Sequence, residues 1–169
     1  TEDGPGIRTT VFFKGCSLQC AWCHNPESIS PKPQIQWVQT ACIGCGICVD
    51  ACPQKALTQT GDAIIVIDRS LCLGCGTCAG ECPSAAMELL GKKWGARDLA
   101  DELVKDRVYF EKSGGGVTLS GGEAALQHDF SLALLKELRG RGIATALDTC
   151  GQVSSKVLAD LLPYVDLLL

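Results

Sequence analysis

The sequence contains no apolar run long enough to cross a bilayer, and no charged-then-apolar leader with a cleavage site opens it. We therefore expect no membrane segment and a cytoplasmic protein. Without a secretion leader, the twelve cysteines argue against a disulfide framework and for bound metal. Basic residues are not in excess, because the net charge is -4 and the pI about 5.1. Nucleic acid is therefore not an expected partner, whereas a protein partner stays open.

Aromatic residues are also scarce, at 5%, but hydrophobic residues make up 46% of the 169 residues. This length suits one domain, or one domain that carries a small insert. Short apolar segments predict strands, and amphipathic segments between them predict helices over 130–141 and 154–162. Such alternation is typical of an α/β fold with a parallel sheet. The predicted strands of this sheet are 8–14, 116–120, 143–148 and 165–169.

The chain divides into three stretches by composition. Residues 1–37 are expected to hold the first strand and a cysteine loop, residues 38–90 a cysteine-rich insert, and residues 91–169 the rest of the sheet. The first residue is not Met, and the closing "YVDLLL" is typical of a buried strand that stops without a turn. We therefore expect an excerpt of a longer protein, truncated at its fourth sheet strand.

The insert contains an internal repeat with an offset of 30 residues. Each copy follows the pattern Cys-x2-Cys-x2-Cys-x3-Cys-Pro, and a predicted strand, 63–68, lies between the copies. The pattern resembles bacterial two-cluster ferredoxins, in which the fourth cysteine ligates the other cluster. We expect that fourth cysteine to start a helix. The predicted ligand sets of the two 4Fe–4S clusters are Cys42, Cys45, Cys48 with Cys82, and Cys72, Cys75, Cys78 with Cys52. Structural zinc is the alternative.

Three further cysteines stand outside the repeat, in the segment "GCSLQCAWCHNP". Cys16, Cys20 and Cys23 supply only three ligands. Three thiolates would fix three irons of a cubane and leave the fourth iron open to a ligand, by the logic of a catalytic zinc site. The trio follows a predicted strand, at the carboxyl end where barrel sheets place their chemistry. Trp22 is expected to lie against a purine ring. A structural zinc knuckle is the alternative.

A glycine-rich segment, "GGGVTLSGGEAALQ", follows later in the chain. It lacks the G-x-G-x-x-G spacing of a dinucleotide site. Its predicted strand ends in Gly121, Gly122 and Glu123, where glycine permits close approach of the backbone to a ligand and a carboxylate can receive an ammonium group. The alternative for this segment is an ordinary turn at the end of a strand.

The cysteine trio, with an aromatic residue before its third cysteine, resembles the radical S-adenosylmethionine (SAM) superfamily. The block "DGPGIRTTVFFKGCSLQCAWCHNPES" resembles the opening of glycyl-radical-enzyme activating enzymes, some of which carry a ferredoxin insert after the trio. The resemblance covers essentially the whole chain. It implies the N-terminal part of a partial (β/α)6 barrel, with an inserted two-cluster ferredoxin-like α+β domain. It also implies three 4Fe–4S clusters and SAM as cofactors.

The resemblance assigns roles within this sequence. The "SGGE" segment matches the family's Gly-Gly-Glu motif, which implies that Gly121, Gly122 and Glu123 hold the SAM amino group. "LDTCG" matches its Asp-Thr-x-Gly motif, which implies that Asp148 and Thr149 seat the SAM carboxylate, with a monovalent cation as a further cofactor. Proline usually follows the glutamate in the family, whereas Ala124 follows it here. Cys150 is expected to be a small buried residue and no ligand.

The resemblance also implies an activity and partners. The implied reaction is reductive cleavage of SAM to a 5′-deoxyadenosyl radical, which then takes hydrogen from a glycine of a partner glycyl radical enzyme. A flavodoxin or ferredoxin is the implied electron donor. The segment "DGPGIR" is expected to help receive the partner's glycine loop, with Asp3 and Arg8 as candidates. The alternatives are a radical SAM enzyme that acts on a small molecule and a ferredoxin-type electron carrier.

Overall fold

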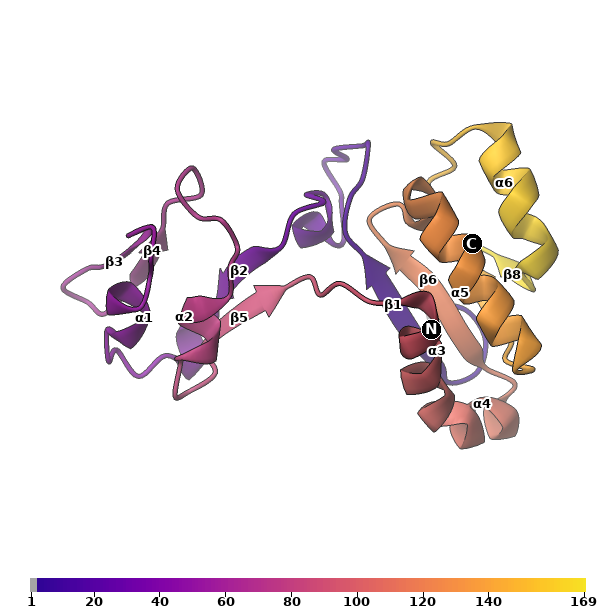
Figure 1. Cartoon of the computed structure of the whole chain (residues 1–169), viewed down its shortest axis with the longest axis horizontal. Coiled ribbons are helices and arrows are strands. Elements are labelled where there is room, and N and C mark those ends of the chain that lie inside the picture. The colour runs from indigo at the N-terminus through magenta and orange to yellow at the C-terminus, as the bar shows by residue number, and fades with distance from the viewer. Residues whose placement is uncertain (1–2) are drawn as a thin grey trace. The chain divides into compact units, whose positions relative to one another are not determined.

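The computed structural model describes residues 3–169. These residues form two compact units, which are described separately (Figure 1). The first, here called the sheet unit, comprises the residues up to Pro31 together with Lys93–Leu169. The second, here called the cysteine-rich unit, is Lys32–Lys92. Among the described residues, no helix is both long and apolar enough to span a membrane.

The sheet unit is built on a four-stranded parallel sheet, which confirms the predicted α/β class with a parallel sheet. The strand order is β1-β6-β7-β8, so strands follow one another in space as they do along the chain. The later strands are shorter than predicted. The strands are β1 (Arg8–Phe13), β6 (Gly116–Gly121), β7 (Thr145–Leu147) and β8 (Leu167–Leu168).

Helices link these strands. The predicted helices near 130–141 and 154–162 are present as α5 (His128–Gly140) and α6 (Ser155–Leu161), and Ser154 caps α6 by accepting a hydrogen bond from the Val157 N–H. Crossovers between parallel strands are right-handed. When each new strand is added at the same edge of the sheet, as here, the connecting helices therefore lie on the same face. The remaining helical segments of this unit are α3 (Ala96–Leu103), α4 (Arg107–Ser113), and the 3-10 turns η1 (Pro26–Ser28), η3 (Val104–Asp106), η4 (Ala124–Gln127) and η5 (Leu162–Tyr164).

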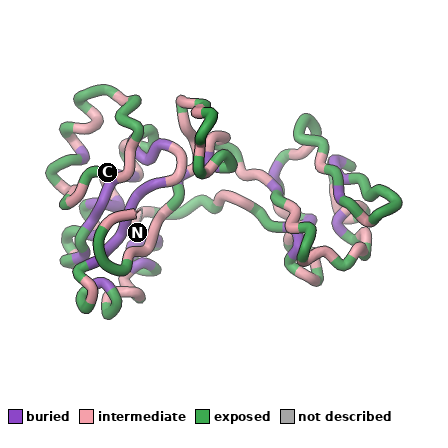
Figure 2. The backbone as a smooth tube through the Cα atoms, turned by 180° about the vertical axis from the view of Figure 1, so that it is seen from behind, coloured by how far each residue is buried: buried purple, intermediate pink, exposed green. Residues whose placement is uncertain are grey.

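The two faces of the sheet differ in polarity because successive side chains of a strand alternate. Val117 and Leu119 of β6 belong to the apolar core that also includes residues of α3 and α5. Thr118 and Ser120 are buried too, but they point to the other face, where their hydroxyl groups form hydrogen bonds. Figure 2 shows these buried strands in purple at the centre of the unit. The sheet therefore has one apolar face and one face that carries polar groups.

The cysteine-rich unit consists of short elements in two similar copies. Its core residues also recur at the offset of 30, since Cys48 corresponds to Cys78 and Leu57 to Met87. Each two-stranded antiparallel sheet pairs one strand from each copy, so the copies interlock. The elements are β2 (Gln34–Trp37), η2 (Gln39–Ala41), α1 (Ile47–Asp50), β3 (Leu57–Gln59), β4 (Ile65–Ile67), α2 (Thr77–Gly80) and β5 (Met87–Leu90), with β2 paired to β5 and β3 to β4.

The helices of this unit correct one expectation. Cys52 and Cys82 do not start helices: each follows a single helical turn, α1 or α2, which contains the third cysteine of its copy. A proline stands directly after each fourth cysteine, and the residue before a proline disfavours the α conformation. The copies also share a left-handed residue beyond the proline, at Lys55 (φ 50°) and Ala85 (φ 53°).

Candidate metal centres and buried carboxylate site

The first predicted ligand set of the cysteine-rich unit is brought together in the fold. Burial raises the pKa of the Cys48 thiol, and three neighbouring cysteines raise it further: Cys42, Cys45 and Cys82. Three of these lie in one copy of the repeat and the fourth in the other. The pairing of strands between the two copies explains this mixed set, because the fourth cysteine of each copy is followed by a strand that pairs with the other copy.

The second set mirrors the first. Burial raises the pKa of the Cys78 thiol, and neighbouring cysteines from both copies raise it further: Cys52, Cys72 and Cys75. A pocket is lined by all four of these cysteines and by apolar side chains that include Ile35, Leu57 and Leu73. A pocket with four thiols and apolar walls fits the donor set of a 4Fe–4S cluster. Within residues 3–169, no three Cys, His or acidic side chains converge as ligands of a single metal ion do.

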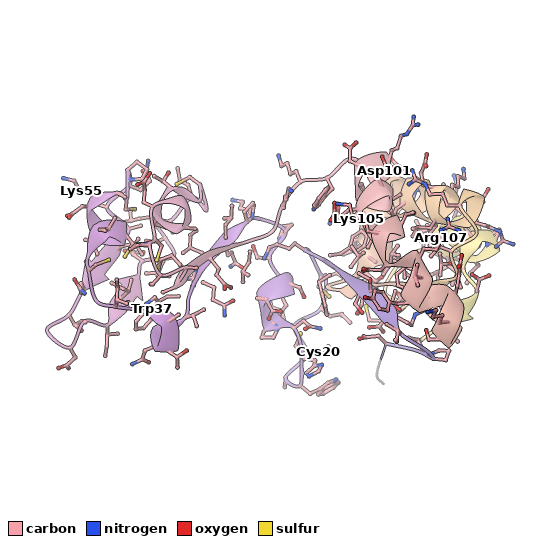
Figure 3. The ribbon with its side chains drawn as sticks, turned by 90° about the horizontal axis from the view of Figure 1, so that it is seen from below. Cys20, Trp37, Lys55, Asp101, Lys105 and Arg107 are labelled. Atoms are coloured by element: carbon pink, nitrogen blue, oxygen red, sulfur yellow. The ribbon has the colours of Figure 1, made fainter. Side chains whose placement is uncertain are left out.

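The cysteine trio lies in the sheet unit, on the loop that leaves the carboxyl end of β1. Figure 3 shows Cys20 on this loop. The loop is anchored at its two ends, since the Gly15 N–H donates to the Ser28 carbonyl (2.7 Å) and the Cys16 N–H to the Ile29 carbonyl (3.0 Å). All three cysteines are partly buried. Trp22 is 85% exposed, so its indole ring is accessible to a ligand but does not pack against the protein.

Gly121 and Gly122 lie against the start of the same loop. The Gly122 N–H donates to the Phe13 carbonyl and the Glu123 N–H to the Gly15 carbonyl, both at 2.8 Å. A Cβ atom on Gly122 would lie 2.3 Å from the Gly15 oxygen. Gly121 has a left-handed φ of 99°, and a Cβ there would also meet backbone, 2.5 Å from the Phe13 nitrogen. The close approach that requires these glycines is therefore made by the chain's own backbone, not only by a ligand as the sequence suggested.

Glu123 is fully buried at the end of this glycine pair, with 0% exposure. Its Oε1 accepts hydrogen bonds from the Ala125 N–H (2.9 Å) and the Thr149 hydroxyl (2.8 Å). Its Oε2 accepts from the Cys150 N–H and thiol, both at 2.9 Å. Within residues 3–169, no Lys, Arg or His side chain forms an ion pair with it. A buried carboxylate without a cationic partner carries a large desolvation cost, which an incoming cation would offset.

Ala124 replaces the proline that usually follows this glutamate in the family, and the loop is held by other means. Ala124 is fully buried, and its carbonyl accepts a hydrogen bond from the Ser131 hydroxyl of α5 at 2.7 Å. The Glu123 side chain caps η4 through the Ala125 N–H. Tertiary hydrogen bonds thus fix a segment that a proline would fix through its restricted φ.

The "LDTCG" segment completes the carboxylate site from the end of β7. Thr149 bonds to Glu123, while Asp148 Oδ2 accepts a hydrogen bond of 2.6 Å from the Ser120 hydroxyl. The expectation that Cys150 is buried is wrong, because this residue is exposed. Its thiol nevertheless touches the Glu123 carboxylate. Partial desolvation of the thiol, on the side of the residue that faces Glu123, and its hydrogen bond to that carboxylate raise the pKa of Cys150 to about 11.

Asp3 and Arg8 lie together, but at the other end of the strands. Arg8 begins β1, whereas the trio follows its end. The Arg8 guanidinium donates to the Thr118 hydroxyl (2.7 Å) and to the Val117 carbonyl (2.8 Å), and that hydroxyl donates to the Asp3 carbonyl (2.8 Å). Burial lowers the pKa of Arg8, although Asp166 and Asp3 oppose the shift. The structure therefore joins these two residues to the polar face of the sheet and not to the trio loop.

Two residues of the polar face were not predicted from the sequence, Thr118 and Ser120. Their only signal is alternation, because Thr118 and Ser120 alternate with the apolar Val117 and Leu119 along β6. Ser120 fixes the Asp148 carboxylate, and Thr118 fixes Arg8. These contacts join segments more than twenty residues apart, so the pairing of β6 with its neighbours had to be known first.

Comparisons with known proteins address both units. Residues 41–86 match the 4Fe-4S dicluster domain family, and residues 2–62 match the 4Fe-4S single cluster domain family. The chain is 49% identical to the trans-4-hydroxy-L-proline dehydratase activating enzyme of Clostridioides difficile, over 92% of this chain and 51% of the relative. It is 43% identical to the (2S)-3-sulfopropanediol dehydratase activating enzyme of Klebsiella oxytoca, over 99% and 54%.

A third relative is named for a synthase and not for a dehydratase. The chain is 42% identical to the benzylsuccinate synthase activating enzyme of Thauera aromatica, over 98% of this chain and 52% of the relative. The chain thus spans about half the length of the curated relatives it matches. Over 92% to 99% of its length, the chain is therefore similar to glycyl-radical-enzyme activating enzymes, the family that its opening block resembles.

Proposed function

We propose that this chain is the catalytic part of a radical SAM activating enzyme, which cleaves SAM reductively and takes a hydrogen atom from a glycine of a partner glycyl radical enzyme. One observation carries the proposal: the buried carboxylate of Glu123 has no cationic partner among residues 3–169, and the backbone N–H of the same residue donates to the Gly15 carbonyl, next to the first cysteine of the trio. A ligand that carries an ammonium group and also reaches an iron centre is the kind of molecule this arrangement would bind.

The trio supplies the reactive centre in this proposal. Cys16, Cys20 and Cys23 would hold three irons of a 4Fe–4S cluster and leave the fourth iron for the ligand. When bound, the cluster supplies one electron to the sulfonium of SAM, which breaks the S–C5′ bond and yields methionine and a 5′-deoxyadenosyl radical. The residues around it bind and orient SAM. The loop places the trio directly beside the glycine pair, because the Glu123 N–H bonds to the Gly15 carbonyl.

The SAM contacts follow from the groups that the fold gathers. Glu123 would receive the amino group, and Gly121 and Gly122 bring its backbone against the trio loop. Thr149 orients the carboxylate of Glu123 and Asp148 lies beside it on the same segment. Asp148 and Thr149 would seat the SAM carboxylate. A monovalent cation would balance the negative charges of the Asp148 and SAM carboxylates. Trp22, exposed on the loop, is proposed to cover the adenine ring.

The cysteine-rich unit is proposed to hold two further clusters, which makes three in all. The two crossed ligand sets and the pocket of the second set support this assignment. The unit offers no catalytic-looking polar residue between its cysteines, so we propose that it relays electrons from a flavodoxin or ferredoxin. Because these clusters would bridge the two copies of the repeat, their binding and the folding of this small unit are coupled.

The partner's glycine is a suitable hydrogen donor. Glycine has no Cβ to block approach, and the two flanking amides stabilise its radical. Relatives of this chain are named as activating enzymes for dehydratases and a synthase, which supports a large protein substrate of this kind. We propose that Asp3 and Arg8, on the polar face of the sheet, help position the glycine loop, within a partial (β/α)6 barrel of which this sheet forms one side.

The test follows the hydrogen atom. The anaerobically reconstituted full protein is mixed with SAM, a reductant and a partner enzyme whose glycine is deuterated at Cα. Deuterium should appear in 5′-deoxyadenosine, and a glycyl radical should appear by electron paramagnetic resonance. SAM cleavage without deuterium transfer would favour a small-molecule substrate. Electron transfer without SAM binding would favour a simple electron carrier.

A Glu123→Gln variant tests the residue that carries the proposal. This change keeps the shape of the side chain and removes its charge, so SAM affinity should fall while cluster content stays the same. The matched control is Glu111→Gln on the exposed surface of α4. Equal SAM affinity in the two variants would show that the buried carboxylate does not receive the ammonium group.

A further inference from the structure

The carboxylate of Glu123 has no free acceptor position in this structure. A carboxylate accepts about four hydrogen bonds, two at each oxygen. At Oε1 the donors are the Ala125 N–H and the Thr149 hydroxyl. At Oε2 they are the N–H and the thiol of Cys150. The Thr149 hydroxyl also lies 2.8 Å from Oε2, but its single proton can serve only one oxygen at a time.

An ammonium group that binds Glu123 must therefore displace one of these donors. The two N–H donors belong to the backbone and cannot turn away without unfolding their segments. The Thr149 hydroxyl is fixed a second time, because it accepts a hydrogen bond from the Gly151 N–H at 3.0 Å. The Cys150 thiol differs from all three, since it is a weak donor on a short side chain at an exposed position.

We propose that the Cys150 thiol occupies the place on Glu123 that the ammonium group of SAM takes, and that it turns outward when SAM binds. The inference rests on the proposed function of Glu123 as the ammonium receptor. It gives the residue between Thr149 and Gly151 a definite role: the thiol satisfies the buried carboxylate in the free protein and competes with the ligand for it. The raised pKa of Cys150 agrees with this role, because a protonated thiol is the form that donates.

If the Cys150 thiol competes with SAM for Glu123, the variants should differ in SAM affinity in an order that a purely supporting role of Cys150 does not predict. Cys150→Ala removes the competing donor, so SAM should bind more tightly. Cys150→Ser replaces it with a hydroxyl, which is a stronger donor to a carboxylate, so SAM should bind more weakly. Each change should alter the dissociation constant by at most about two- to twelvefold, the range that corresponds to the net contribution of one hydrogen bond. If Cys150 merely supported Glu123, alanine would weaken binding and serine would preserve it.

The experiment measures equilibrium binding of SAM to the reconstituted, oxidised holoprotein, in the wild type and both variants. 5′-Methylthioadenosine, which lacks the ammonium and carboxylate groups, serves as the control ligand and should bind all three proteins equally. Iron content and circular dichroism must match the wild type. If the alanine variant loses iron, the comparison of serine with wild type still decides, since only competition makes serine weaker.

Three outcomes would overturn the inference. If the wild type binds SAM but the order of affinities is reversed or flat, Cys150 does not compete for Glu123 and the proposed function stands unchanged. If the wild-type holoprotein does not bind SAM at all, the proposed function fails and this inference fails with it. A difference among the variants that persists with 5′-methylthioadenosine would also contradict the competition, because that ligand has no ammonium group to compete.

Discussion

Replacement of Gly122 by alanine should damage the trio site while it leaves the cysteine-rich unit intact. A Cβ at this position would lie 2.3 Å from the Gly15 oxygen and 2.9 Å from the Ser28 oxygen. Such a pair needs roughly 3.3 Å, so the two segments would have to part by about 1 Å. That movement breaks the hydrogen bond from the Glu123 N–H to the Gly15 carbonyl. Overpacking and the lost bond together should cost roughly 2–4 kcal/mol.

The assay compares this variant with Gly140→Ala, at the end of α5, where a Cβ meets no atom within 4 Å. The control should be neutral or slightly more stable, because alanine favours a helix over glycine by up to about 1 kcal/mol. In the Gly122 variant, iron should fall from about 12 to about 8 per chain, as the trio cluster is lost and the other two remain. SAM binding should be lost with it. Equal iron content and equal SAM affinity in the two variants would refute the steric argument.

Three further predictions concern the clusters and the backbone. The reconstituted full protein should contain about 12 iron atoms per chain, from three cubanes, and iron near four or stoichiometric zinc would contradict the assignment. Cys45→Ala or Cys75→Ala should slow activation of the partner enzyme when a protein donates the electrons, and a strong small-molecule reductant should partly restore the rate. A normal activation rate with the protein donor, in a folded variant, would exclude a relay. Lys55→Gly should raise the urea-unfolding midpoint of the unit by removing a left-handed strain of about 1 kcal/mol, and an unchanged midpoint would show that the strain is absent.

The sequence predicted those features whose signal is local. Cysteine spacing within twelve residues predicted each ferredoxin-like motif, from Cys42 to Pro53 and from Cys72 to Pro83, and the offset of 30 predicted two equivalent copies. Alternating apolar segments predicted the parallel sheet, whose first and second strands begin at the expected residues, Arg8 and Gly116. The opening block resembled the activating enzymes to which nearly the whole chain is similar. These signals are visible in the sequence alone because ligand spacing and side-chain alternation depend only on neighbours along the backbone.

Other features depended on strand pairing and could not be read from the chain. The short strand β2 alternates polar and apolar residues over only four positions, and nothing in that pattern shows that it pairs with β5 at the far end of the same unit. The sequence marked Gly122 as a glycine near a ligand, but its steric need comes from Gly15, over a hundred residues earlier. Cys150 was expected to be buried because free cysteine packs as a small apolar residue.

The tertiary structure decided these points for one physical reason. A hydrogen bond or a steric contact between distant segments depends on register, and register is fixed only when all strands of the sheet are in place. The parallel pairing of β1, β6 and β7 aligns Gly15, Glu123 and Thr149 at the carboxyl ends of their strands. Composition and spacing thus determined which metal chemistry this protein can support. The sheet alone decided which side chains surround the buried carboxylate.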